Sequence, residues 1–169
     1  MPLRISFKTS PQRVDWATLN AKWRLAGERG GRDGAWLNDH LTDMDPDVPG
    51  PSLEAFALLA TLVHHVPGLR VGHAVLSNTF RHPSVLAKQA TVLDHVTGGR
   101  FILGIGAGWH EGEHEQLGIP LPPLRERFDR FESSLEALRA LFSDAARQPP
   151  GVDLVTPHDE DTVEPDVRS

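Results

Sequence analysis

The sequence alternates four times between a short apolar segment and a longer amphipathic one, and this alternation restricts the chain to few folds. The short segments are almost continuously apolar, as in strands buried on both faces of a parallel sheet, and parallel strands need a crossover helix between them. The expected strand–helix pairs are residues 4–8 with 16–29, 35–37 with 52–63, 69–77 with 83–97, and 101–105 with 128–142. The sequence therefore predicts an α/β fold, with a parallel sheet, covering helices and right-handed crossovers.

Each expected helix has one apolar face, and the first three also have a recognisable start or end. Ser52 is a candidate N-cap, Pro83 suits a first helical position, and glycine pairs follow residues 29 and 97. The last helix has the clearest amphipathic pattern, with large apolar side chains every three or four residues. The residues expected to face the sheet are Leu19, Trp23, Ala26, Phe56, Leu59, Leu62, Val63, Leu86, Ala90, Leu93, Val96, Phe128, Phe131, Leu135, Leu138 and Phe142.

The net charge of −6 is concentrated near the C-terminal end. Residues 143–169 hold seven of the 23 acidic side chains and two of the 17 basic ones, and contain few apolar groups. We therefore expect a folded domain over residues 1–142 and an acidic disordered tail over 143–169. The folded part is nearly neutral, which argues against nucleic-acid binding. Without cysteines, a long apolar run or a secretion signal, the chain is expected to be a soluble cytoplasmic protein.

Polar and glycine-rich motifs stand where the second, third and fourth strands run into loops. Asp39-His40 follows the second strand, Asn-Thr-Phe-Arg-His-Pro (78–83) follows the third, and Gly-Ile-Gly-Ala-Gly-Trp (104–109) spans the end of the fourth. In barrels of alternating strands and helices, this end of the strands carries the chemistry. Because Trp109 stands in place of the last glycine of a dinucleotide-binding fingerprint, close packing at the rim explains the glycines better.

Five blocks in this order resemble the luciferase-like flavin and deazaflavin oxidoreductases. They are the Asp39-His40 pair, NTFRHP (78–83), VLAKQATVLDHVTGGRFILGIGAGW (85–109), LGIPLPP (117–123) and RFDRFESSLEALRALF (127–142). The resemblance covers roughly residues 3–142 and is closest to members that use the deazaflavin coenzyme F420, with flavin mononucleotide (FMN) as the alternative cofactor. Family members are TIM-type (β/α)8 barrels, so it implies an N-terminal half-barrel of about four strand–helix units. Strands five to eight and a late glycine-rich phosphate site would be missing, so we expect a truncated member.

The resemblance also implies roles for individual residues. His40 would be catalytic, donating a hydrogen bond to the cofactor ring or shuttling a proton beside it, and Asp39 would orient His40 or bond the cofactor. The residues expected to bind the cofactor are Asp39, His40, Ala74, Val75, Thr79, Gly106 and Trp109. The residues alone favour the alternative, in which Asp39 caps a loop and His40 is a partly exposed turn histidine.

Two of these positions carry a further expectation. The Ala74–Val75 bond aligns with a non-prolyl cis peptide that family members often have behind the cofactor ring, and an ordinary trans strand is the alternative. Trp109 would form one wall of the site. It stands where some sugar-phosphate-oxidising relatives have an acidic glutamate, which puts that substrate class in doubt.

Other polar residues have competing interpretations. His110, Glu111 and His114 spell H-E-x-x-H, the zinc motif of metallopeptidases, but Gly112 weakens the helix that such a site requires. We expect no metal site and keep a zinc hydrolase as a minor alternative. His73 either faces a ligand or is a satisfied core histidine, and Arg81 either contacts a cofactor tail or bonds adjacent carbonyls.

Two functional hypotheses follow. The first is an oxidoreductase or monooxygenase that moves hydride between F420, or a flavin, and a small organic substrate. The second is a non-catalytic half-barrel that acts as an interaction protein. In either case we expect a homodimer, because the first and fourth strands would be sheet edges with unpaired backbone groups. We expect no nucleic-acid partner and no membrane partner.

Overall fold

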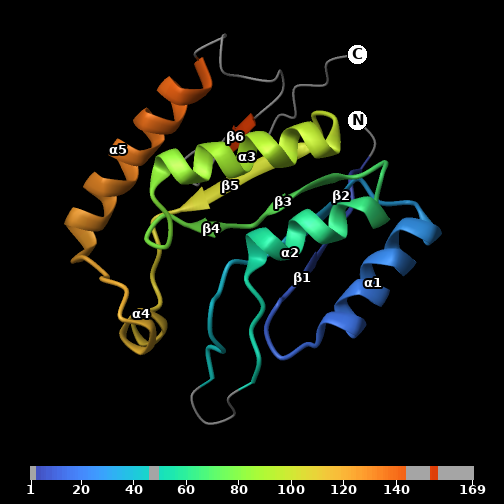
Figure 1. Cartoon of the computed structure of the whole chain (residues 1–169), viewed down its shortest axis with the longest axis horizontal. Coiled ribbons are helices and arrows are strands. Elements are labelled where there is room, and N and C mark those ends of the chain that lie inside the picture. Colours follow the sequence, from blue (N-terminus) through green and yellow to red (C-terminus); the bar gives the residue numbers. More distant parts are fainter. Residues whose placement is uncertain (1–2, 46–49, 144–152, 156–169) are drawn as a thin grey trace.

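The computed structural model describes residues 3–45, 50–143 and 153–155, with strands and helices in the predicted alternating order (Figure 1). The elements are β1 (Ser6–Thr9), α1 (Trp16–Arg29), β2 (Gly34–Leu37), α2 (Ala55–Leu62), the 3-10 turn η1 (Val63–His65), β3 (Arg70–His73), β4 (Leu76–Ser77), α3 (Pro83–Thr97), β5 (Phe101–Gly106), α4 (Glu111–Leu117), α5 (Leu124–Ser143) and β6 (Asp153–Val155).

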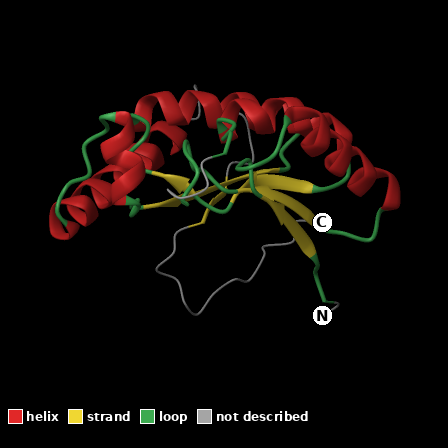
Figure 2. Ribbon diagram, turned by 90° about the horizontal axis from the view of Figure 1, so that it is seen from below, coloured by secondary structure: helices red, strands yellow, loops and turns green. Residues whose placement is uncertain are grey.

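Strands β1, β2, β3 and β5 pair side by side, all in parallel. In this register Ala35 of β2 aligns with Phe7 of β1 and with Val71 of β3. The short β4 follows β3 along the chain and also pairs with β5. Figure 2 shows the helices on one side of the sheet. The predicted α/β fold with a parallel sheet is confirmed.

Helix α1 has the predicted bounds and the predicted buried face. Asp15 caps it by accepting the Thr18 N–H at 2.7 Å. Leu19, Trp23 and Ala26 are buried against the sheet, and the Trp23 indole N–H donates to the Thr9 hydroxyl at 2.9 Å. Burial of an aromatic side chain with its polar atom satisfied fixes α1 on the sheet.

Helix α2 begins later than the sequence predicted. Glu54, and not Ser52, is its N-cap, since the Glu54 carboxylate accepts the Ala57 N–H at 2.6 Å. The Ser52 hydroxyl instead donates to the carbonyl of His40 at 2.7 Å. Ser52 therefore supports the loop after β2, a long-range role that local capping patterns do not reveal.

The apolar stripe of α3 was predicted with one error. Leu86, Ala90 and Leu93 are buried, but Val96 is 49% exposed and Thr97 is buried in its place. A step of four residues from Leu93 keeps to the buried line, whereas a step of three leads to the flank. In α5, Phe131, Leu138 and Phe142 are buried, and Phe128 is 37% exposed.

The strand that was predicted over residues 69–77 is divided into β3 and β4. The Ala74–Val75 peptide bond between them is cis, the first of the two alternatives left open by the sequence. Beside this break, Gly104 of β5 packs directly on the backbone, because a Cβ atom there would lie 2.1 Å from the carbonyl oxygen of His73. The glycine lets β5 approach β3 closely at the rim.

This close approach leads to a stability prediction. Gly104→Ala should lower the free energy of unfolding by about 1–3 kcal/mol, since the two strands must separate to admit a methyl group. Gly68→Ala is the matched control, because no atom lies within 4 Å of its Cβ position, and it should change stability by less than about 0.5 kcal/mol. Urea denaturation of both variants measures the difference. Equal stabilities would contradict the close packing.

Most of the predicted disordered tail, residues 143–169, lies outside the described residues. Asp153–Val155 form β6, which pairs in parallel with β5 and was not predicted. β6 thus occupies one of the two edges on which the homodimer expectation was based, and the homodimer stays a prediction. Among the described residues there is no helix long and apolar enough to cross a membrane.

Candidate functional site

A cleft of about 300 Å³ opens where β2, β4 and β5 end. Its lining residues are Lys8, Asn38, Asp39, His40, Met44, Ala74, Val75, Leu76, Ser77, Phe80, Gly106, Gly108, Trp109, His110, Glu113 and His114. All the predicted cofactor-binding residues except Thr79 are among them. A larger hollow of about 410 Å³ beside the β1–α1 loop shares only Lys8 with this cleft. The residues singled out by the sequence therefore gather in one place.

Asp39, one of the residues that line the cleft, forms a buried ion pair. Its side chain is 0% exposed, and its oxygens accept from the Arg81 guanidinium at 2.6 and 2.9 Å and from the Ser77 N–H at 2.9 Å. Arg81 also pairs with Glu54. Burial alone would lower the pKa of Arg81, but these two carboxylates raise it above its ordinary value.

These contacts bear on two expectations, and cofactor binding by Asp39 stays a prediction. Arg81 was predicted to contact a cofactor tail or adjacent carbonyls, and instead it joins Asp39 to Glu54. Asp39 was predicted to orient His40 or to bond a cofactor. With both oxygens engaged by Arg81 and Ser77, it fixes the turn after β4 against the end of β2.

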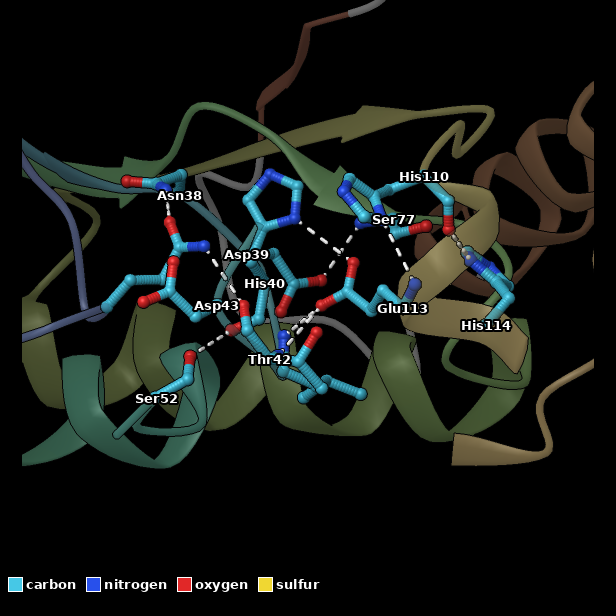
Figure 3. Close-up of polar contacts among 12 residues, drawn as sticks. Asn38, Asp39, His40, Thr42, Asp43, Ser52, Ser77, His110, Glu113 and His114 are labelled. Atoms are coloured by element: carbon cyan, nitrogen blue, oxygen red, sulfur yellow. Dashed lines mark hydrogen bonds and ion pairs between the residues drawn. The ribbon is translucent and has the colours of Figure 1, made fainter. Parts of the chain in front are cut away.

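His40 is held by Glu113, which the sequence did not identify. Nδ1 of His40 lies 3.1 Å from Oε2 of Glu113, and Oε1 accepts the N–H groups of Leu41 and, at 3.1 Å, of Thr42 (Figure 3). Burial raises the pKa of Glu113, but these hydrogen bonds outweigh it and leave the pKa below its usual value. The His40 ring also lies edge-on to the rings of Trp109 and His110, with centroid distances of 6.1 and 6.3 Å.

The floor of the cleft is apolar. Val75 is 46% exposed there, directly after the cis peptide bond, and Gly106 lies beside it. A Cβ atom on Gly106 would lie 2.9 Å from Cγ2 of Val75. Trp109, which is 62% exposed, stands at the side. A flat group can therefore approach the backbone at this floor more closely than a side chain at position 106 would permit.

Thr79 lies behind the cleft. Its hydroxyl contacts Ser77 Oγ at 2.6 Å and Nε2 of His114 at 2.7 Å. Nδ1 of His114 bonds the His110 carbonyl at 2.7 Å, so both ring nitrogens of the buried His114 have protein partners. Thr79 was predicted to bind the cofactor, and in the structure it contacts His114, which lines the cleft.

The H-E-x-x-H segment is helical, which the sequence did not predict, but it is used differently from a zinc site. His110 is the N-cap of α4, and its Nδ1 accepts the Glu113 N–H at 3.0 Å. With the nitrogens of His114 occupied as well, the two histidines are not available as a pair of metal ligands. Over the described residues, no group of three or more metal-binding side chains gathers. The geometry gives the zinc-hydrolase alternative no support.

His73 is a core histidine, as in one of the two alternatives, but it is only partly satisfied because its Nδ1 is buried without a hydrogen-bond partner among the described residues. It is 1% exposed, its Nε2 lies 3.2 Å from the Ala55 carbonyl oxygen, and its ring stacks on Phe56 at 5.1 Å. Burial lowers the pKa of His73 to about 4. It packs against the start of α2 and is not among the residues that line the cleft.

Comparison with known proteins identifies the family. The family model described as luciferase-like monooxygenase matches residues 9–158. The chain belongs to the luciferase-like monooxygenase family. The F420-dependent glucose-6-phosphate dehydrogenase of Amycolatopsis mediterranei is 28% identical over 142 residues, which are 83% of this chain and 42% of that protein. The 4-hydroxyprotoasukamycin monooxygenase of Streptomyces nodosus subsp. asukaensis is 33% identical over 129 residues, which are 76% of this chain and 32% of that protein.

Solved structures give the same picture of the fold. An F420-dependent secondary alcohol dehydrogenase in complex with an F420–acetone adduct matches with a TM-score of 0.79 at 18% identity, over 92% of this chain and 52% of that one. Riboflavin lyase with modified FMN matches with a TM-score of 0.70 at 20% identity, over 84% of this chain and 38% of that one. This luciferase-like chain thus spans a third to a half of the length of these four proteins. Relatives in the family use F420 or FMN.

Proposed function

We propose that this luciferase-like chain forms the His40 side of an oxidoreductase site that moves hydride between coenzyme F420 and a small organic substrate. The observation that carries the proposal is the position of His40. Its ring lines the cleft, with Nδ1 tied to Glu113 and one side against Trp109. The F420-dependent names among the relatives support the same cofactor class.

The residues of the cleft fit a planar ring. Ala74, Val75 and Gly106 would lie beneath it, where the missing Cβ of Gly106 leaves room, and Trp109 would stand at its side. Pockets for small molecules usually measure about 300–1,000 Å³, so a cleft of about 300 Å³ suits a ring system rather than a whole cofactor with its tail. Bound F420 would supply the ring carbon that accepts or releases hydride.

His40 would handle the proton that accompanies the hydride. Oxidation of an alcohol-type substrate releases a proton with the hydride, and a neutral imidazole within hydrogen-bond reach of the substrate oxygen can take it. In the reverse direction the protonated ring would return it. Asp39 would contribute indirectly, by fixing the turn that follows the cleft floor, since its oxygens are engaged by Arg81 and Ser77.

Binding of the coenzyme tests this proposal. We expect the 169-residue chain to bind F420 with a dissociation constant in the tens of micromolar or weaker, roughly a thousandfold weaker than a complete site, because phosphate and tail contacts would be missing. His40→Ala should weaken binding by about three- to tenfold, the effect of one hydrogen bond. Fluorescence titration of F420, with a parallel titration of FMN, measures both values.

The control is His95→Ala, since His95 is exposed on α3, away from the cleft, and its loss should leave the titration unchanged. Asp39→Ala is unsuitable because it would leave Arg81 without its buried partner. Equal affinities for wild type and His40→Ala would remove His40 from the site. If FMN binds more tightly than F420, FMN becomes the proposed cofactor. If neither coenzyme binds, the hypothesis of a non-catalytic interaction protein is favoured.

A further inference from the structure

Glu113 makes an unusual set of contacts for a side chain on a short helix. Its side chain is 1% exposed, and its carboxylate has three hydrogen-bond partners, all from the loop directly after β2: the His40 ring and the donating N–H groups of Leu41 and Thr42. Figure 3 shows the carboxylate directed at this loop, with the second ring nitrogen of His40 pointing away from Glu113. One residue of α4 thus holds both the backbone after β2 and the candidate catalytic ring.

The chemistry of these groups determines where the proton of His40 lies. An ionised carboxylate has only acceptor atoms, so the ring nitrogen that faces it must carry hydrogen. The hydrogen bonds keep the pKa of Glu113 below its ordinary value, despite burial, and this supports the ionised form. A neutral His40 therefore carries its hydrogen on Nδ1, and Nε2 has a lone pair.

We infer that Glu113 is a positioning residue, which fixes His40 in the tautomer with hydrogen on Nδ1 and presents an unprotonated Nε2 to the cleft. The inference rests on the proposed function of His40. Glu113 would act as the partner of one ring nitrogen, whose hydrogen bond sets the protonation state of the other nitrogen. Within this role Glu113 touches neither substrate nor cofactor and acts through His40.

Glu113 is itself fixed by the start of α4. The His110 side chain accepts the N–H of Glu113 at 3.0 Å, and α4 begins two residues after Trp109. A buried carboxylate is stable only when its charge is compensated, and the three donors from residues 40–42 supply that compensation. The same Glu113 contacts therefore orient His40 and hold α4 against the loop after β2.

Substitution by glutamine separates this role from a purely structural one. In Glu113→Gln, the amide oxygen should keep the two backbone N–H groups of Leu41 and Thr42, because only an acceptor can satisfy both. The amide NH2 group then faces Nδ1 of His40, which must become an acceptor, so the hydrogen moves to Nε2. The prediction is a reversed tautomer in a protein that remains folded.

The measurement is ¹⁵N nuclear magnetic resonance of the histidine rings in the cofactor-free chain at about pH 8, where an ordinary imidazole is neutral. The His40 signals are assigned by their loss in His40→Gln. Wild type should show hydrogen on Nδ1, Glu113→Gln on Nε2, and the control Glu111→Gln, exposed on the same helix, should match wild type.

Several results would overturn the inference. A wild-type ring with hydrogen on Nε2 would do so whether or not any variant folds, and so would an unchanged tautomer in folded Glu113→Gln. Because no cofactor is present, the outcome is independent of the titration proposed above. A confirmed tautomer without F420 binding would reject the proposed function and leave the positioning role of Glu113 standing.

Discussion

Arg81→Leu is expected to lower the free energy of unfolding by about 3–5 kcal/mol, because it leaves a fully buried carboxylate without its charge partner. The Asp39 side chain is 0% exposed and takes two of its three hydrogen bonds from Arg81. Glu54, 41% exposed, also loses a partner but remains hydrated. Urea denaturation followed by circular dichroism at neutral pH measures the loss.

The control for this prediction is Arg130→Leu. Arg130 pairs with Glu126 one helical turn away, with both side chains more than half exposed, and such a pair contributes less than about 1 kcal/mol. The double variant Asp39→Asn/Arg81→Leu should recover part of the stability lost in the single one, since it removes the uncompensated charge. A loss below about 1 kcal/mol in Arg81→Leu would show that Asp39 reaches water or another donor.

Acidification should destabilise the protein through His73. In the folded protein burial lowers the pKa of His73 to about 4, whereas an unfolded chain has a histidine pKa near 6.5. Between these values the unfolded state binds the proton and the folded state does not, so stability falls as the pH falls. The loss begins below about pH 6.5, is complete near pH 4, and reaches about 3 kcal/mol.

His73→Gln isolates this contribution, because glutamine can still donate to the Ala55 carbonyl but does not titrate. We expect the wild-type free energy of unfolding to decline more steeply than that of His73→Gln between about pH 6.5 and pH 4. His95→Gln, at an exposed position on α3, should retain the wild-type slope. Parallel pH profiles for wild type and His73→Gln would mean that the folded protein protonates His73 readily.

The parts of the fold that local patterns control were predictable from the sequence. Helix α1 has both its bounds and its buried face as predicted, because a clear periodicity and a terminal glycine pair agree there. The order of strands and helices followed in the same way. Errors arose where a residue type suits two different roles. Ser52 was expected to cap α2, but its hydroxyl donates to the His40 carbonyl in the loop after β2.

The candidate site was predictable in its location but not in its contacts. The end of β2 was identified because Asp-His follows an apolar strand, yet the partners of this pair, Arg81 and Glu113, lie 42 and 73 residues further along the chain. Spacing in sequence gives no information on contacts of that range. Glu113 was also hidden within H-E-x-x-H, where Gly112 indicated a loop and the motif drew attention to the histidines.

The connection between β5 and α5 gathers several parts of the cleft on one continuous segment. Trp109 at the side of the cleft, the His110 cap and the Glu113 carboxylate all come from a stretch that leaves the sheet after Gly106 and rejoins regular packing at Leu124. Its contacts with the rest of the cleft run to the loop after β2 and to the turn at Thr79. Because residues 107–123 carry the Trp109 wall and the Glu113 carboxylate on one connection, a change in the course of this segment would alter both together while the strands beneath stay the same.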